Sequence, residues 1–195
     1  MESVYCVLDK SGSMSTHVND TIKGFNAFVS SQPPDTLMTT ILFNNTIQEV
    51  YRCRKASTIK PLDAISFRPV GCTALLDVIG YTISLASNCT ADNITIAIIT
   101  DGEDNASVTY TKQMIHRLIE EKKSLGWTFV FMGANQDAIQ VANELNINSN
   151  SALTFNAACV KNAFECLSNA VNRFRSGENN GIEFSADERR FSCTI

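Results

Sequence analysis

The chain has 195 residues, a formal net charge of −4 and an apolar fraction of 44 %. This length suits one domain, or one domain with a short appendage, and the composition is that of a soluble globular protein. The acidic balance and the lack of a basic run argue against a nucleic-acid binder and against a peripheral membrane protein.

No targeting signal is evident in the sequence. The N-terminal apolar segment is too short for a signal peptide and follows no basic region, and no stretch reaches the length of a membrane span. The chain has seven cysteines, an odd number with no C-x-x-C pair, and reduced thiols account for them most simply. We therefore expect a cytoplasmic protein that contacts neither membrane nor nucleic acid and is a monomer on its own.

The first half of the chain alternates between strand-like and helix-like patterns. Apolar residues at helical spacing predict a helix over residues 17–31, which Pro33 and Pro34 end. A turn of two asparagines, Asn44 and Asn45, separates two β-rich runs and suggests a hairpin. The later run should then be an antiparallel edge strand. The strands predicted in this half are residues 3–8, 36–43 and 46–53.

The second half continues the alternation. The uninterrupted apolar run over residues 94–99 is typical of a parallel strand covered on both faces. The other predicted strands are residues 127–132 and 152–155, and the predicted helices start near Thr73, near Met114, at 136 and at 157. This order predicts an α/β fold, a three-layer α/β/α sandwich with a mostly parallel sheet between two layers of helices.

The composition changes near the end of the chain. From Ser176 the sequence becomes polar, and its last dozen residues place four charges around isolated apolar residues. We expect a domain over residues 1–175 followed by a tail over residues 176–195. The tail is either a short extra strand or a docking segment.

Three loops of the predicted sheet carry oxygen ligands. Asp9, Ser11 and Ser13 alternate just past the first strand, Asp101 follows the strand of residues 94–99, and Thr73 starts a helix. Loops at the carboxyl ends of central strands form the binding crevice of an open α/β sheet. Two carboxylates and three hydroxyls are hard ligands that suit Mg²⁺, Mn²⁺ or Ca²⁺.

Each of these residues also has a purely structural explanation. Thr73 could be a helix N-cap, Asp101 could belong to a turn with Gly102, and the serines could satisfy local backbone groups. The convergence of all three loops on one edge of the sheet favours a metal site over three separate coincidences.

The constellation resembles the metal-ion-dependent adhesion site of von Willebrand factor type A domains. The resemblance rests on Asp9-x-Ser11-x-Ser13, on Thr73 in GCTALLD and on Asp101 in ITDGED, and it covers residues 2–175. Small, stand-alone, intracellular bacterial or phage-type members, rather than adhesion-receptor domains, look similar in four segments: TIKGFNAFV, TALLDVIGYTI, TDGEDNAS and GWTFVFMGANQDA.

The resemblance implies a ligand scheme and a topology. Ser11 and Ser13 would bind the cation directly, Asp9 and Asp101 would act mostly through water, and Thr73 would do either. An Asp or Glu of a protein partner would complete the octahedron. The Rossmann-like sheet would have six strands in the order 3-2-1-4-5-6, with the edge strand antiparallel. The implied function is non-catalytic, metal-dependent binding of a protein partner.

Two other functions stay open. A metal-dependent phosphoesterase would use Asp9 as nucleophile, but Ser11 stands where its acid/base partner would be. No phosphate-binding loop and no G-x-S-x-G elbow is present, and His17 and His116 are expected to face solvent. Alternatively, the fold could bind partners without metal through the helix of residues 136–145 or the tail.

Three further polar residues have two interpretations each. Asp77 could support the site from behind its ligands or be an exposed acid at a helix start. Asn135 and Asp137, in GANQDA, could contact a partner or serve as turn and helix-capping residues.

Overall fold

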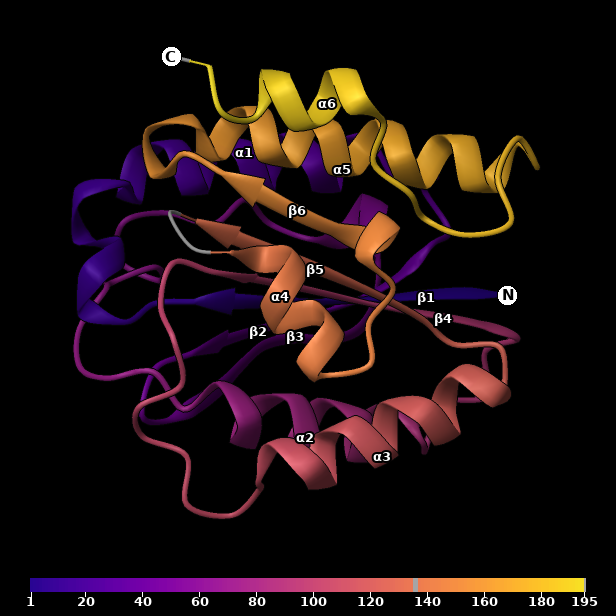
Figure 1. The fold of residues 1–195 in the computed structure, drawn as a ribbon. Coiled ribbons are helices and arrows are strands. Elements are labelled where there is room, and N and C mark those ends of the chain that lie inside the picture. The colour runs from indigo at the N-terminus through magenta and orange to yellow at the C-terminus, as the bar shows by residue number, and fades with distance from the viewer. Residues whose placement is uncertain (135–136, 195) are drawn as a thin grey trace.

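A computed structural model describes residues 1–134 and 137–194. One six-stranded sheet in the order β3-β2-β1-β4-β5-β6 forms the middle layer (Figure 1). The β2–β3 pair is antiparallel and every other pair is parallel. This confirms the predicted fold class, strand order and antiparallel edge. The strands are β1 Glu2–Asp9, β2 Leu37–Phe43, β3 Ile47–Lys55, β4 Asn93–Thr100, β5 Thr128–Ala134 and β6 Ala152–Phe155.

Helices cover both faces of the sheet (Figure 1). One face packs against α1 (Val18–Ser30) and α5 (Val160–Arg175), and the other against α2 (Leu75–Ala86), α3 (Lys112–Ser124) and α4 (Ala138–Glu144). A 3₁₀ helix over Gly12–Thr16, which the sequence patterns did not predict, joins β1 to α1. The predicted helix over 136–145 begins at Gln136, which lies outside the described residues. No helix within residues 1–134 and 137–194 is long and apolar enough to cross a membrane.

Strand β1 shows why the central strands are continuously apolar. Val4, Cys6 and Leu8 belong to the core on the α1/α5 face, whereas Tyr5 and Val7 belong to the core on the α2/α3 face. Successive side chains of a strand point to opposite faces, so a strand covered on both faces needs apolar residues at every position. The layered fold follows directly from this pattern.

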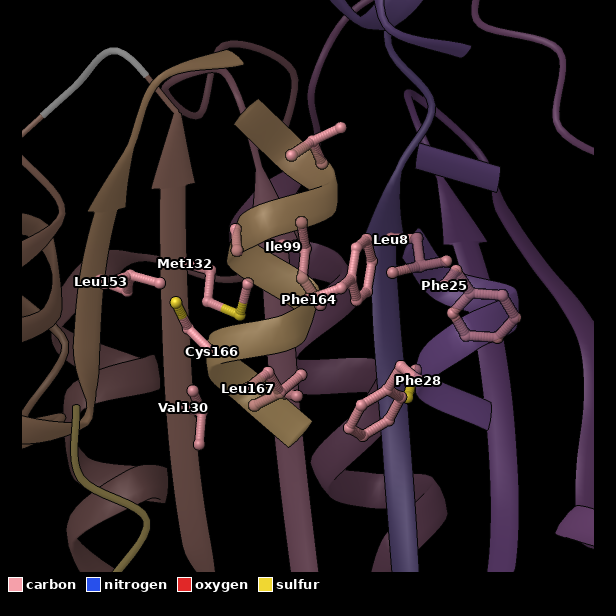
Figure 2. Close-up of a cluster of buried hydrophobic side chains, with 14 of the residues drawn as sticks. Leu8, Phe25, Phe28, Ile99, Val130, Met132, Leu153, Phe164, Cys166 and Leu167 are labelled. Carbon is pink, nitrogen blue, oxygen red and sulfur yellow. The ribbon is translucent and has the colours of Figure 1, made fainter. Parts of the chain in front are cut away.

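Aromatic packing joins α1 and α5 over the sheet. Figure 2 shows Phe25 and Phe28 from α1 and Phe164 from α5 close to Leu8 of β1. The rings of Phe25 and Phe164 meet edge to face, with centroids 6.3 Å apart. Such pairs stabilise a core by about 0.5–1.5 kcal/mol beyond the burial of their area.

The segment after α5 packs back onto the domain. Ile182 and Phe184 are buried in the same core as Phe25, and α6 (Ala186–Phe191) lies against α5 (Figure 1). Arg189 donates hydrogen bonds to the carbonyls of Ser149 and Asn150, just before β6, and of Ala152, the first residue of β6. The described part of the segment is therefore docked; it contains one short helix, α6, and forms no strand. A domain boundary at residue 175 stays a prediction.

Candidate functional site

A buried carboxylate marks the centre of the sheet edge where β1 and β4 end. Asp9, the last residue of β1, is fully buried. Its Oδ2 accepts a hydrogen bond from Thr100 Oγ1 at 2.6 Å, and its Oδ1 accepts one from the Ser11 amide at 2.7 Å. Burial raises the pKa of Asp9 and the nearby Asp101 adds to the rise, although the donors Thr100 and Ser11 oppose it.

Ser11 and Ser13 connect Asp9 to Asp101. The Oγ atoms of Ser11 and Ser13 lie 3.1 Å apart, and Ser13 Oγ donates to Asp101 Oδ1 at 2.6 Å. Ser11 is buried and Ser13 is exposed. The chain of polar contacts therefore runs from the buried end of β1 to the surface and crosses to the loop after β4.

Thr73 enters the same site from the third loop. Asn105 Oδ1 accepts the Thr73 amide at 2.8 Å, and the Thr73 carbonyl accepts the Asn105 amide at 2.9 Å. A Cβ built on Gly102 would lie 3.3 Å from Thr73 Oγ1, so the threonine hydroxyl faces the backbone next to Asp101. Ala74, not Thr73, is the N-cap of α2, and the helix start uses no side-chain cap. The structural explanation of Thr73 as an N-cap is therefore wrong.

The loop that carries Asp101 is attached to the start of α2 by side chains. Asp77 accepts the backbone amides of Val108, Thr109 and Tyr110 at 2.8–2.9 Å. Burial alone would raise the pKa of Asp77, but these three amides lower it below its ordinary value. Asp77 thus positions the loop that carries Asp101. It supports the site from behind its ligands and also lies in the first turn of α2, so it combines the two roles that the sequence suggested.

Sequence reasoning missed three residues that assemble the site: Thr100, Asp104 and Asn105. Asp104 Oδ1 accepts the amide of Leu76 in the first turn of α2 at 3.2 Å. Thr100 also accepts the amide of Gly102 at 3.2 Å, which shapes the turn that holds Asp101. A short polar residue beside a predicted site residue is the only signal that could have marked them.

The donor set fits a hard divalent cation. It comprises the carboxylates of Asp9 and Asp101 and the hydroxyls of Ser11, Ser13 and Thr73. In the described part of the chain, no three His, Cys, Asp or Glu side chains gather as a metal-binding group. Oxygen ligands without sulfur or imidazole suit Mg²⁺, Mn²⁺ or Ca²⁺ better than softer metals.

Exposed apolar residues flank this edge of the sheet. Val108, in the loop after β4, is 92 % exposed, and Val70, just before Gly71, is 61 % exposed. The Val70 amide donates to the carbonyl of Lys10, which holds it beside the loop after β1. Apolar side chains around a polar site are typical of a surface that contacts another macromolecule.

Of the two roles predicted for Asp137, the structure shows that of a helix-capping residue. It is the N-cap of α4, and its Oδ1 accepts the Gln140 amide at 3.0 Å. Asn135, for which the sequence left the same two interpretations, lies outside the described residues.

No family model and no curated protein matches this sequence. Solved structures match its fold. A von Willebrand factor type A protein from Catenulispora acidiphila superposes with a TM-score of 0.62 at 13 % identity, over 86 % of this chain and 42 % of that one. The vWF domain of the type V pili tip protein Mfa5 from Porphyromonas gingivalis superposes with a TM-score of 0.65 at 12 % identity, over 87 % and 94 % of the two chains.

Proximal thread matrix protein 1 from the mussel byssus, with a zinc-occupied MIDAS motif, gives a TM-score of 0.58 at 16 % identity, over 88 % of this chain and 46 % of that one. The chain thus spans less than half of the Catenulispora and mussel proteins. At these identities the likeness establishes the fold, which is the von Willebrand factor type A fold.

Proposed function

We propose that this chain is a protein-interaction module that binds an acidic side chain of a partner through a divalent cation. The observation that carries the proposal is the contact of Ser13 with both Ser11 and Asp101. It brings oxygen ligands from two separate strand ends together, beside Thr73 of a third loop. A polar loop with only a local role would not need this convergence.

The chemistry of the ligands supports the binding of a carboxylate. Three of the five candidate ligands are neutral hydroxyls, and Asp9 and Asp101 would act mostly through water, so no carboxylate of this chain would bond directly to the cation. A direct bond to a carboxylate from outside is therefore favourable when the metal is bound. Without metal, the acidic rim of Asp101, Glu103 and Asp104 would repel the same carboxylate. The metal would thus switch the surface from rejecting acidic ligands to binding them.

We assign direct metal bonds to Ser11 and Ser13, water-mediated ones mostly to Asp9 and Asp101, and either kind to Thr73. Mg²⁺ is the proposed cation, with Mn²⁺ or Ca²⁺ as substitutes. The zinc-occupied motif of the mussel protein supports a divalent metal in this fold. We also propose that the module is non-catalytic, cytoplasmic and monomeric on its own, and that it contacts neither membrane nor nucleic acid.

The first prediction concerns metal-dependent stability. Mg²⁺ or Mn²⁺ at about millimolar concentration should raise the melting temperature relative to EDTA, because a ligand that binds only the folded state stabilises it. Asp9→Ala should abolish the rise. Differential scanning fluorimetry measures both.

Because Asp9 is buried, Ser13→Ala is the companion variant that tests the site on the surface. Its matched control is Ser15→Ala, which removes an exposed hydroxyl from the same 3₁₀ helix. Ser13→Ala should weaken the metal-dependent shift, and Ser15→Ala should leave it intact. The absence of any shift in the wild type would overturn the assignment of the site.

The second candidate function is a scaffold that binds partners without metal through α4 or the C-terminal segment. A pull-down from the native cell with and without chelator separates the two functions, with Asp9→Ala as control. Binding that survives both chelation and the variant favours the scaffold. A phosphoesterase would instead show turnover of a generic phosphoester that Asp9→Asn abolishes.

A further inference from the structure

Positive charge is concentrated on β3, an edge strand of the sheet, although the net charge of the chain is −4. Arg52, Arg54 and Lys55 lie at the end of this strand, and Lys60 follows on the connection to α2. All four are exposed. Cys53 interrupts the series, which is why no basic run stands out in the sequence.

A cavity of about 430 Å³ lies among these cations. Its lining residues are Val50, Tyr51, Arg52, Arg54, Thr58 and Lys60. This volume falls within the roughly 300–1,000 Å³ that is typical of ligand pockets. Charges that only keep an edge strand from aggregating need no concavity between them. The hollow therefore indicates a binding surface.

Two of the cations in the cavity have no acidic partner within the described chain. Arg52 donates to Glu49 at 2.6 and 2.9 Å, and Lys55 outside the cavity pairs with Asp35. No hydrogen bond or ion pair joins the side chain of Arg54 or Lys60 to another described residue. Because the Arg54 side chain has no such partner, it is available for a ligand. Guanidinium groups bind carboxylates through paired hydrogen bonds, so an acidic ligand suits it.

The backbone of β3 disfavours the pairing of a regular strand here. Its register with β2 shifts twice, on either side of Thr40, and Cys53 has a positive φ of 49°. Bulges of this kind re-aim side chains and end regular pairing. A second copy of the chain would in addition place the same cations opposite one another. The occupant should therefore be recognised by its side chains and carry negative charge.

The cavity is separate from the candidate metal site. In the register of the sheet, Arg54 on β3 lies opposite Met38 on β2, and Met38 lies opposite Val4 on β1. Val4 is five residues before Asp9. At about 3.3 Å per residue, the two surfaces lie roughly 16 Å apart along the sheet. Both could be occupied at once.

We propose that the cavity beside β3 binds an acidic peptide segment of a protein partner, with Arg54 and Lys60 holding its carboxylates. Val50 and Tyr51 provide the apolar part of the wall, which suits a peptide better than a free inorganic anion. This inference does not depend on the metal site, because no candidate metal ligand lines the cavity.

The test is a binding titration of the full chain with a short fluorescent peptide in which glutamate alternates with alanine, in EDTA and at about 50 mM salt. The matched peptide replaces every glutamate with glutamine. The glutamate peptide should bind at least about tenfold more tightly, and added salt should weaken it. EDTA excludes binding through a metal, so a failure here leaves the proposed metal function untouched.

Charge-reversal variants locate the binding. Arg54→Glu with Lys60→Glu should lower the affinity at least about tenfold, and the milder Arg54→Gln should lower it in the same direction. Arg117→Glu, at an exposed position on α3, is the control for charge and should change the affinity less than about twofold. Failure of the glutamate peptide to bind, equal weakening by Arg117→Glu, or binding of inorganic phosphate alone would each overturn the proposal.

Discussion

At the scale of single residues, the candidate site depends on a glycine as well as on its oxygen ligands. Gly71 has a φ of +81°, and its carbonyl accepts the Gly12 amide at 2.9 Å. This contact joins the loop of Thr73 to the loop of Ser11 and Ser13. Glycine adopts such a φ without the steric penalty that a Cβ brings.

Gly71→Ala should destabilise the fold and disturb the site. The new Cβ would displace the end of the Asn45 side chain, and the positive φ would strain the alanine backbone, at a cost of about 1–3 kcal/mol. Urea denaturation followed by circular dichroism measures the loss. Gly181→Ala is the control, because nothing lies within 4 Å of its Cβ position. Equal stability of the two variants would contradict the proposed role of Gly71.

At the scale of elements, one ion pair attaches α6 to α5. Arg173 donates to the two carboxylate oxygens of Glu188 at 2.8 and 2.6 Å, and Ser185 and Glu188 form a capping box at the start of α6. Glu188 is buried. Burial alone would raise its pKa, but Arg173 and the Ser185 amide lower it below its ordinary value.

The lowered pKa makes the docking of α6 depend on pH. A carboxylate whose pKa falls on folding stabilises the folded state above its unfolded pKa, and this stabilisation is lost as the pH falls through the folded pKa. The free energy of unfolding of the wild type should therefore exceed that of Glu188→Gln by about 1–3 kcal/mol at neutral pH. This difference should shrink below about pH 4.5. Denaturation at a series of pH values measures it.

The control for this series is Asp187→Asn, which removes an exposed acid whose partner is Arg190. Its effect on stability should be small at every pH, because exposed ion pairs contribute little. A pH dependence of Glu188→Gln that matches the wild type would show that the pair does not hold α6.

At the scale of the whole molecule, the C-terminal segment closes the core that begins with β1. Ile182 and Phe184 fill the α1/α5 face, and Arg189 and Ser192 bind the edge of β6. The free energy of unfolding of a chain ending at Arg175 should be lower by about 3–6 kcal/mol. This chain would lack both apolar side chains, and burying each contributes about 1.5–3 kcal/mol. Its melting temperature, compared with that of the full chain, measures the loss.

This truncation also tests the proposed boundary at residue 175. An unchanged melting temperature would mean that residues 1–175 fold as an independent domain and that the segment is a separable tail. A large loss would mean that the segment is part of the domain core.

The order of strands and helices followed from the sequence, because it depends on local periodicity. Six strand-like runs, the stop at Pro33-Pro34 and the turn at Asn44-Asn45 suffice to predict the sheet and its antiparallel edge. The site candidates followed as well, since parallel strands place their carboxyl ends at one edge. Their role as metal ligands stays a prediction.

Only the tertiary structure decided how these parts are held and what else the surface offers. Asp77 binds amides 31–33 residues away, and Glu188 pairs with a helix 15 residues before it. The cavity at Arg54 and Lys60 requires β3 and the following connection to be placed side by side. Such contacts join segments whose distance in space no local pattern encodes, so they appear only once the chain is folded.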